Sequence, residues 1–184
     1  MADAESTGYA DERRRLTVAL ERERSQLIRN IETCRIRDID RPFIAEWSLK
    51  DIVGHVSSWE AEVIVSLRQL REGKSPDLLR FAPSRVPEWN EDHVERKRSL
   101  HFWDLYQQLT DGRQRLMDEI AQLSDEAIGA EGSVAGRLLQ ATLDHDRHHW
   151  HDIAAKLAGM AGARSASGAS IPAETAGVTE EVAQ

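Results

Sequence analysis

The chain has 184 residues, with 24 Lys and Arg against 32 Asp and Glu, and a net charge of −8. This acidic balance argues against a nucleic-acid or anionic-membrane binder, because clustered Lys and Arg recognise both polyanions. No apolar run approaches the roughly 18 residues of a membrane helix, and the acidic N-terminus is unlike a secretory signal peptide. The single cysteine, Cys34, excludes an intramolecular disulfide. We therefore expect a cytoplasmic protein that contacts neither nucleic acid nor membrane.

Apolar residues at helical spacing predict four helical regions joined by connectors that hold most of the Gly and Pro. Ser48 and Asp51 form a capping box that begins the second helix. The third region is expected to break or bend near Ser99. The predicted helical regions are 11–34, 48–71, 89–123 and 134–158.

These elements predict an all-α fold, an antiparallel four-helix bundle. The connector over 74–88 contains three prolines, and loops of this length often form a lid or a pocket wall. A turn-rich connector is expected over 123–133. We expect a flexible N-terminus over 1–10, the bundle domain over 11–158, and a flexible Ala-, Gly- and Ser-rich tail over 159–184.

Four of the seven histidines lie between positions 145 and 151. On a helical wheel of about 100° per residue, His145 and His149 lie at one edge of the apolar stripe, and His148 and His151 lie on the solvent side. His55 lies at the edge of the stripe of the second helix. Side chains on facing helices of a bundle can bind one metal ion together. Three imidazole ligands leave the fourth coordination position of a tetrahedral ion open for water or substrate. The spacing alone also allows a solvated histidine patch on a bundle that chiefly dimerises.

Three further residues are candidates for the surroundings of such a site. Asp146 points into the apolar stripe on the same wheel, where an unpaired carboxylate is costly, so we expect it to meet the metal, a histidine or an arginine. Trp59 follows His55 by one turn and Trp150 adjoins His149, so each could wall a pocket. No motif for Ser-His-Asp catalysis and no glycine-rich phosphate loop is present, so no catalytic residue is assigned.

Two motifs in the chain resemble those of the DinB-like superfamily. The stretch from Trp47 to Trp59 matches the signature W-S-x-K-D-x-x-x-H-x-x-x-W, and His145-x-x-x-His149 resembles the histidine pair on the last helix. The chain is most similar to the DfsB-like and thiol S-transferase-like branches. It departs from the pattern at Asp146, where related proteins often have an aromatic residue, and in the additional His148 and His151.

The resemblance implies a four-helix bundle, often a homodimer, that holds a divalent transition metal such as zinc, nickel or iron. Carried over to this sequence, the metal ligands are His55, His145 and His149. Superfamily members with known activity include S-transferases that use low-molecular-weight thiols, a maleylpyruvate isomerase, and hydrolases of reactive electrophiles.

We therefore expect a metal-dependent hydrolase or thiol S-transferase that acts on a small electrophilic compound in stress or detoxification, with a low-molecular-weight thiol as a candidate cosubstrate. The alternative is a non-enzymatic protein that sequesters a small molecule in the bundle pocket. A polar cavity beside an open coordination site would favour catalysis, whereas a dry apolar cavity would favour binding.

Overall fold

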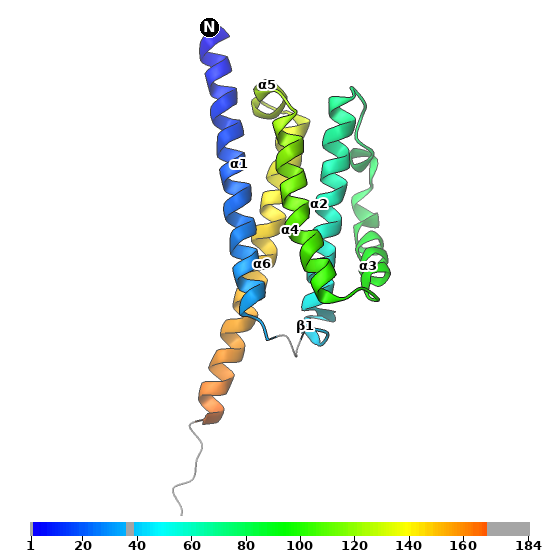
Figure 1. Ribbon diagram of the computed structural model, residues 1–184, viewed down its shortest axis with the longest axis vertical. Coiled ribbons are helices and arrows are strands. Elements are labelled where there is room, and N and C mark those ends of the chain that lie inside the picture. Colours follow the sequence, from blue (N-terminus) through cyan, green and yellow to red (C-terminus); the bar gives the residue numbers. More distant parts are fainter. Residues whose placement is uncertain (1, 36–38, 169–184) are drawn as a thin grey trace, which may run out of the picture.

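The fold is an all-α helical bundle, as predicted. A computed structural model describes residues 2–35 and 39–168 (Figure 1). Short 3-10 helices, η2 and η3, and a two-stranded sheet lie in the connectors. The elements in chain order are α1 (Ala2–Thr33), β1 (Pro42–Ile44), β2 (Trp47–Ser48), α2 (Leu49–Arg71), η2 (Asp77–Arg80), η3 (Pro83–Arg85), α3 (Val86–Lys97), α4 (Phe102–Ala121), α5 (Asp125–Gly129) and α6 (Val134–Gly168).

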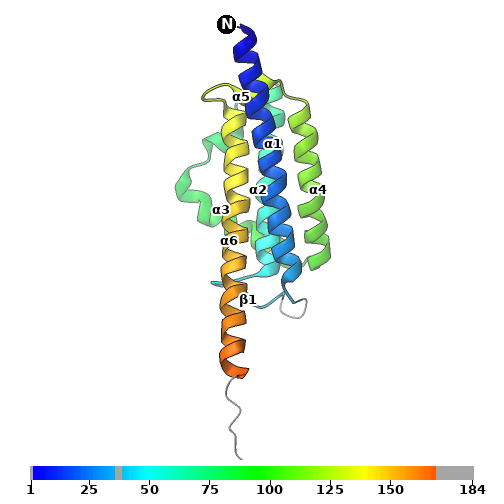
Figure 2. The same cartoon turned by 90° about the vertical axis from the view of Figure 1, so that its left-hand side faces the viewer.

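The four long helices pack as two pairs (Figures 1 and 2). The two helices of a pair run in the same direction, and the two pairs run in opposite directions. α1 lies along α6, and α2 lies along α4. The connector after α2, which contains η2, η3 and α3, returns the chain to the end of the bundle where α2 begins (Figure 1). The predicted break near Ser99 is confirmed, because α3 ends at Lys97 and α4 begins at Phe102.

The start of α2 is fixed by its cap and by the small sheet before it. The predicted capping box is present: the Asp51 backbone N–H donates to Ser48 Oγ at 3.1 Å, and the Ser48 backbone N–H donates to Asp51 Oδ2 at 2.9 Å. β1 pairs with β2 in an antiparallel register, Pro42 with Ser48 and Ile44 with Trp47. This sheet was not predicted, because two strands of three and two residues carry no alternating pattern.

Two helices extend beyond their predicted bounds. α1 begins at Ala2, so the expected flexible segment over 1–10 is helical from residue 2. Its first turns pack against α5, which was predicted to be part of a turn-rich connector. The contact is so close that a Cβ on Gly129 would lie 2.5 Å from the Tyr9 carbonyl oxygen. α6 continues past the expected end at Ala158 to Gly168, and the rest of the expected tail lies outside the described residues.

The apolar core is divided into two clusters along the bundle. One is built around Leu20, Val63, Leu116 and Leu143. The other is built around Leu27, Val56, Leu109 and Ile153. Within the described ranges, no helix combines the length and the apolar character that crossing a membrane requires.

Candidate metal centre

Three histidine rings from two helices converge at one point inside the bundle. His55 projects from α2, and His145 and His149 project from successive turns of α6. The Nε2 atoms of His55 and His149 each lie 3.0 Å from Nε2 of His145. Two nitrogens bound to one tetrahedral ion at about 2.0–2.1 Å are roughly 3.4 Å apart, so the spacing is close to that of a shared ion. The structure therefore brings together the three ligands that the resemblance implies.

Burial keeps all three imidazoles neutral. It lowers the pKa of His55 to about 2, and the neighbouring His145 and His149 lower it further. Burial likewise lowers the pKa of His145 to about 4 and the pKa of His149 to about 3. Because the neutral ring is the form that binds a metal, these side chains have available lone pairs at pH 7.

Two tryptophan rings pack against the His55 ring. The Trp47 ring of β2 lies 4.8 Å from the His55 ring, and the Trp59 ring lies 6.5 Å from it, edge-on. Trp59 is itself tied to α3, because its Nε1–H donates to Asn90 Oδ1 at 2.9 Å. His55 Nδ1 is buried and has no hydrogen-bond partner among the described residues. Ring packing by Trp47 of β2 and by Trp59 of the same helix, α2, thus helps to fix its orientation.

A layer of four buried charges lies beside the histidines. Arg24 of α1 donates to Asp146 of α6 at 3.0 Å and to Glu60 of α2 at 3.0 and 3.1 Å. Arg113 of α4 lies 2.7 Å from Asp146 and 2.9 Å from Glu60. Two positive and two negative side chains therefore neutralise one another at the centre of the bundle. We call these four residues the charge layer.

The charge layer separates the two apolar clusters and connects all four long helices. Burial alone would raise the pKa of Asp146, but the charges of Arg24 and Arg113 lower it. Asp146 follows His145 directly, so its ion pairs also fix this part of α6. Of the three partners that the sequence allowed for Asp146, the structure selects arginine.

Three members of the charge layer were not predicted from the sequence: Arg24, Glu60 and Arg113. Their signal lies in their position within the apolar stripes. Each follows an apolar residue by four positions and precedes another by three, so each falls where a core residue is expected. The flanking pairs are Leu20 and Leu27, Val56 and Val63, and Leu109 and Leu116.

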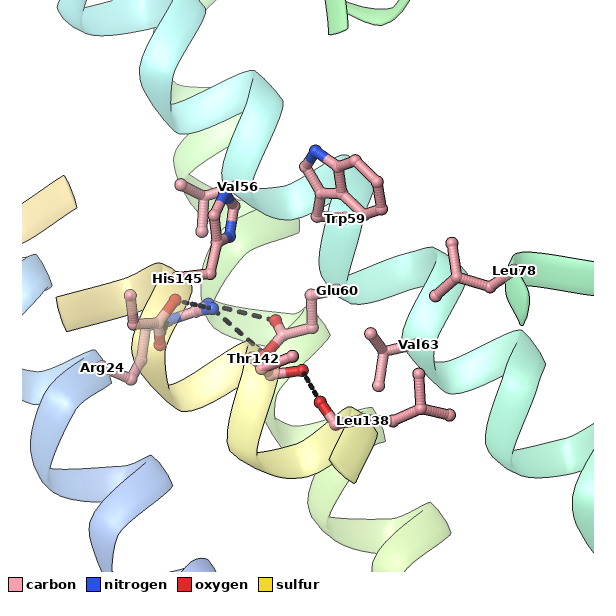
Figure 3. Close-up of a pocket in the computed structure, with 11 residues that line it drawn as sticks. Arg24, Val56, Trp59, Glu60, Val63, Leu78, Leu138, Thr142 and His145 are labelled. Carbon is pink, nitrogen blue, oxygen red and sulfur yellow. Dashed lines mark hydrogen bonds and ion pairs between the residues drawn. The ribbon is translucent and has the colours of Figure 1, made fainter. Parts of the chain in front are cut away.

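A cavity of about 220 Å³ adjoins the histidines and the charge layer (Figure 3). His145 and Trp59 border it, and Arg24, Glu60 and Asp146 form its polar side. The remaining lining consists of Thr142 and of apolar residues from α2, η2 and α6: Val56, Val63, Leu78, Leu138 and Ala141. The long connector contributes one wall through Leu78, in agreement with its expected role.

The remaining candidates lie away from this cavity. Trp150 was a candidate pocket wall, but its Nε1–H donates to Glu23 of α1 at 2.8 Å and its ring packs with the core cluster of Leu27. His148 and His151 are exposed, as the helical wheel predicted. His148 lies 3.3 Å from Asp152 on the surface of α6.

Fold and site together define a helical bundle with a buried three-histidine cluster on two facing helices. The chain belongs to the DinB superfamily, whose model matches residues 14–153. A solved structure with the same fold is the crystal structure of an uncharacterised protein from Escherichia coli UTI89, with a TM-score of 0.72 and 14% sequence identity. That likeness covers 81% of this chain and 94% of the other. No curated protein shows significant sequence similarity to the chain.

Proposed function

We propose that the protein is a metal-dependent enzyme in which His55, His145 and His149 hold one divalent transition metal ion. The substrate is a small electrophilic compound, and the reaction is hydrolysis or transfer of a low-molecular-weight thiol. The observation that carries the proposal is the convergence of three neutral Nε2 atoms. When bound, a divalent ion would supply Lewis-acid polarisation or activate a water or thiol nucleophile.

The contacts of His145 favour an ion over a hydrogen-bonded cluster. Its Nε2 lies 3.0 Å from both His55 Nε2 and His149 Nε2. In a neutral imidazole this nitrogen carries either one proton or one lone pair, so a conventional hydrogen bond satisfies only one of the two contacts. A cation shared by three lone pairs satisfies all of them. An all-imidazole donor set suits zinc, nickel or iron.

Neighbouring residues support a site that acts on a bound compound. His145 belongs both to the triad and to the cavity wall, so a molecule in the cavity would lie beside the ligands. Asp146 is held by Arg24 and Arg113, and these ion pairs fix the part of α6 that carries His145 and His149. The chain would thus supply a rigid ligand set and a compartment next to it.

A second candidate function is sequestration without turnover. It is favoured by the apolar character of most of the cavity lining, because a dry apolar cavity is typical of a binding site. Incubation with a reactive electrophile separates the two: an enzyme consumes the compound, whereas a binding protein retains it unchanged.

Metal content tests the leading proposal directly. We expect the purified protein to carry one divalent ion per chain by elemental analysis, and His55→Ala to carry almost none while it retains the helical circular dichroism of the native protein. His148→Ala is the matched control, because it removes an exposed histidine of the same cluster. An unchanged metal content in His55→Ala would overturn the assignment.

A further inference from the structure

The walls of the cavity beside His145 are built from aliphatic side chains on two helices and one connector (Figure 3). Val56 and Val63 come from α2, Leu138 and Ala141 from α6, and Leu78 from η2. The Trp59 ring adds an aromatic wall near His145, with 6.3 Å between the ring centroids. A ligand here would gain binding energy chiefly from apolar surface removed from water.

Arg24 is the cation on the polar side of the cavity, yet it has no donor left for a ligand. A guanidinium has five N–H groups. In Arg24, Nε donates to Asp146, Nη1 to Glu60 and the Leu109 carbonyl oxygen, and Nη2 to Glu60 and Asp146. Its charge is also matched, because Glu60 and Asp146 are both buried with it. An incoming anion would therefore meet two carboxylates and no available N–H of Arg24.

The other polar side chains of the wall, apart from His145, are also engaged. The Thr142 hydroxyl donates to the Leu138 carbonyl oxygen at 2.8 Å. The Trp59 indole N–H donates to Asn90 Oδ1 at 2.9 Å. An anion placed here would lose its hydration without a replacement hydrogen-bond donor from these groups, which is strongly unfavourable. The lining thus selects against a negative charge.

The size of the cavity restricts the ligand further. A cavity of about 150 Å³ lined by apolar side chains accommodates benzene, and drug-sized ligands need about 300–1,000 Å³. The volume of about 220 Å³ lies between these cases. It suits a single substituted ring or a short branched chain, and it leaves no room for a thiol cosubstrate beside such a molecule.

We infer that this cavity binds a neutral, largely apolar molecule about the size of a monosubstituted benzene and rejects its anionic analogue. That this molecule is the substrate of the metal centre rests on the proposed function. A thiol cosubstrate would then approach the histidines from outside this compartment. Binding itself depends on the cavity walls and is expected with or without bound metal.

Two probes of similar shape test the inference: ethylbenzene, which is neutral, and phenylacetate, which is anionic. The readout is the indole N–H cross-peak of Trp59 in ¹⁵N-labelled full-length protein, assigned with Trp59→Phe. Titrations are made on the protein as purified and again after dialysis against a chelator. We expect ethylbenzene to shift this peak in both samples, and phenylacetate to bind at least about tenfold more weakly in the metal-free sample.

A pair of alanines on α6 provides a matched control. Ala141 and Ala155 are both exposed, but only Ala141 lines the cavity. We expect Ala141→Phe to fill the cavity and weaken ethylbenzene binding at least about tenfold, and Ala155→Phe to leave it unchanged. Equal binding of the two probes to metal-free protein, or unchanged binding in Ala141→Phe, would overturn the inference. A failure of the proposed metal site would appear instead in the metal content and would leave these titrations unaffected.

Discussion

His55 and His145 are separated by 90 residues in the sequence, yet their Nε2 atoms lie 3.0 Å apart. The two rings come from helices that run in opposite directions, so their meeting depends on how α2 and α6 are aligned along the bundle (Figure 1). The capping box fixes where α2 begins, and the ion pairs of Asp146 fix α6. The site is therefore a property of the assembled bundle, and binding of an ion should stabilise that assembly.

Removal of the proposed metal ion should lower the thermal stability of the native protein. A ligand at about 100 times its Kd adds about 2.7 kcal/mol to the free energy of unfolding, which corresponds to about 5–10 °C in Tm for a chain of this size. We expect a chelator to lower the Tm of the native protein and of His148→Ala by this amount. His55→Ala should show no chelator effect. Equal shifts in all three proteins would argue against a site that contains His55.

The metal-free protein should lose stability as the pH falls. The three buried rings have pKa values of about 2 to 4 in the folded chain, against 6.5 for an unperturbed histidine. Below about pH 6.5 the unfolded chain therefore binds more protons than the folded chain, and the free energy of unfolding decreases as the pH falls toward 4. Urea unfolding of chelator-treated protein at pH 7 and pH 5 measures this difference.

Replacement of one of the buried rings is the control for the pH effect. His55→Gln should show a smaller loss of stability between pH 7 and pH 5 than the native chain, because one fewer buried imidazole must remain neutral. His148→Ala, which removes an exposed ring, should match the native protein. A pH dependence that is the same in all three proteins would show that the triad is not its source.

Local patterns were sufficient to predict the bundle and to sort the histidine cluster. The helical period fixes which residues share a face, so the wheel separated His145 and His149 from the exposed His148 and His151. Local patterns did not predict the full length of α1, because its first turns carry no strong apolar stripe. They are ordered by contact with α5 near Tyr9 and Gly129, and such a contact is not encoded within one segment.

The sequence shows which positions of the charge layer fall in the core, but it does not show how the four residues pair. In each of the four long helices, one charged residue occupies a core position of the apolar stripe. Asp146 was recognised by this pattern. Which carboxylate meets which arginine depends on the relative axial positions of four helices, and no single stripe contains that information. For the same reason, the helical wheels showed only that His55 and the last-helix pair lie at the edges of two stripes and could meet. The family resemblance assigned the three histidines to one site.

Neutralising Asp146 should be strongly destabilising. Asp146→Asn would leave Arg24 and Arg113 facing Glu60 alone, which is one uncompensated positive charge in the core. Breaking a buried ion pair in this way costs about 3–5 kcal/mol. Urea unfolding gives the change, with Asp11→Asn as the control, because Asp11 pairs with Arg14 on the surface and contributes about 0–1 kcal/mol. Similar effects of the two substitutions would mean that the charge layer contributes little to stability.

Two glycines within helices should respond to alanine with opposite signs. In an exposed helix interior, Gly→Ala is favourable by up to about 1 kcal/mol. This gain applies to Gly8 of α1, where a new Cβ would meet nothing within 4 Å. At Gly112 of α4, the new Cβ would lie 2.8 Å from Glu60 Oε2. A carboxylate end can usually move, but that of Glu60 is held by Arg24 and Arg113, so relief of the clash would break charge-layer contacts.

We therefore expect Gly8→Ala to raise the free energy of unfolding slightly and Gly112→Ala to lower it, as measured by urea unfolding at pH 7. The glycine at position 112 weakens α4 locally, and the structure gives a reason for it: the helix must leave room for the carboxylate of Glu60. A double variant distinguishes this explanation from a general packing defect. In Glu60→Ala the carboxylate is gone, so adding Gly112→Ala should cost less than it does in the native chain. Equal costs in the two backgrounds would show that Glu60 is not what position 112 accommodates.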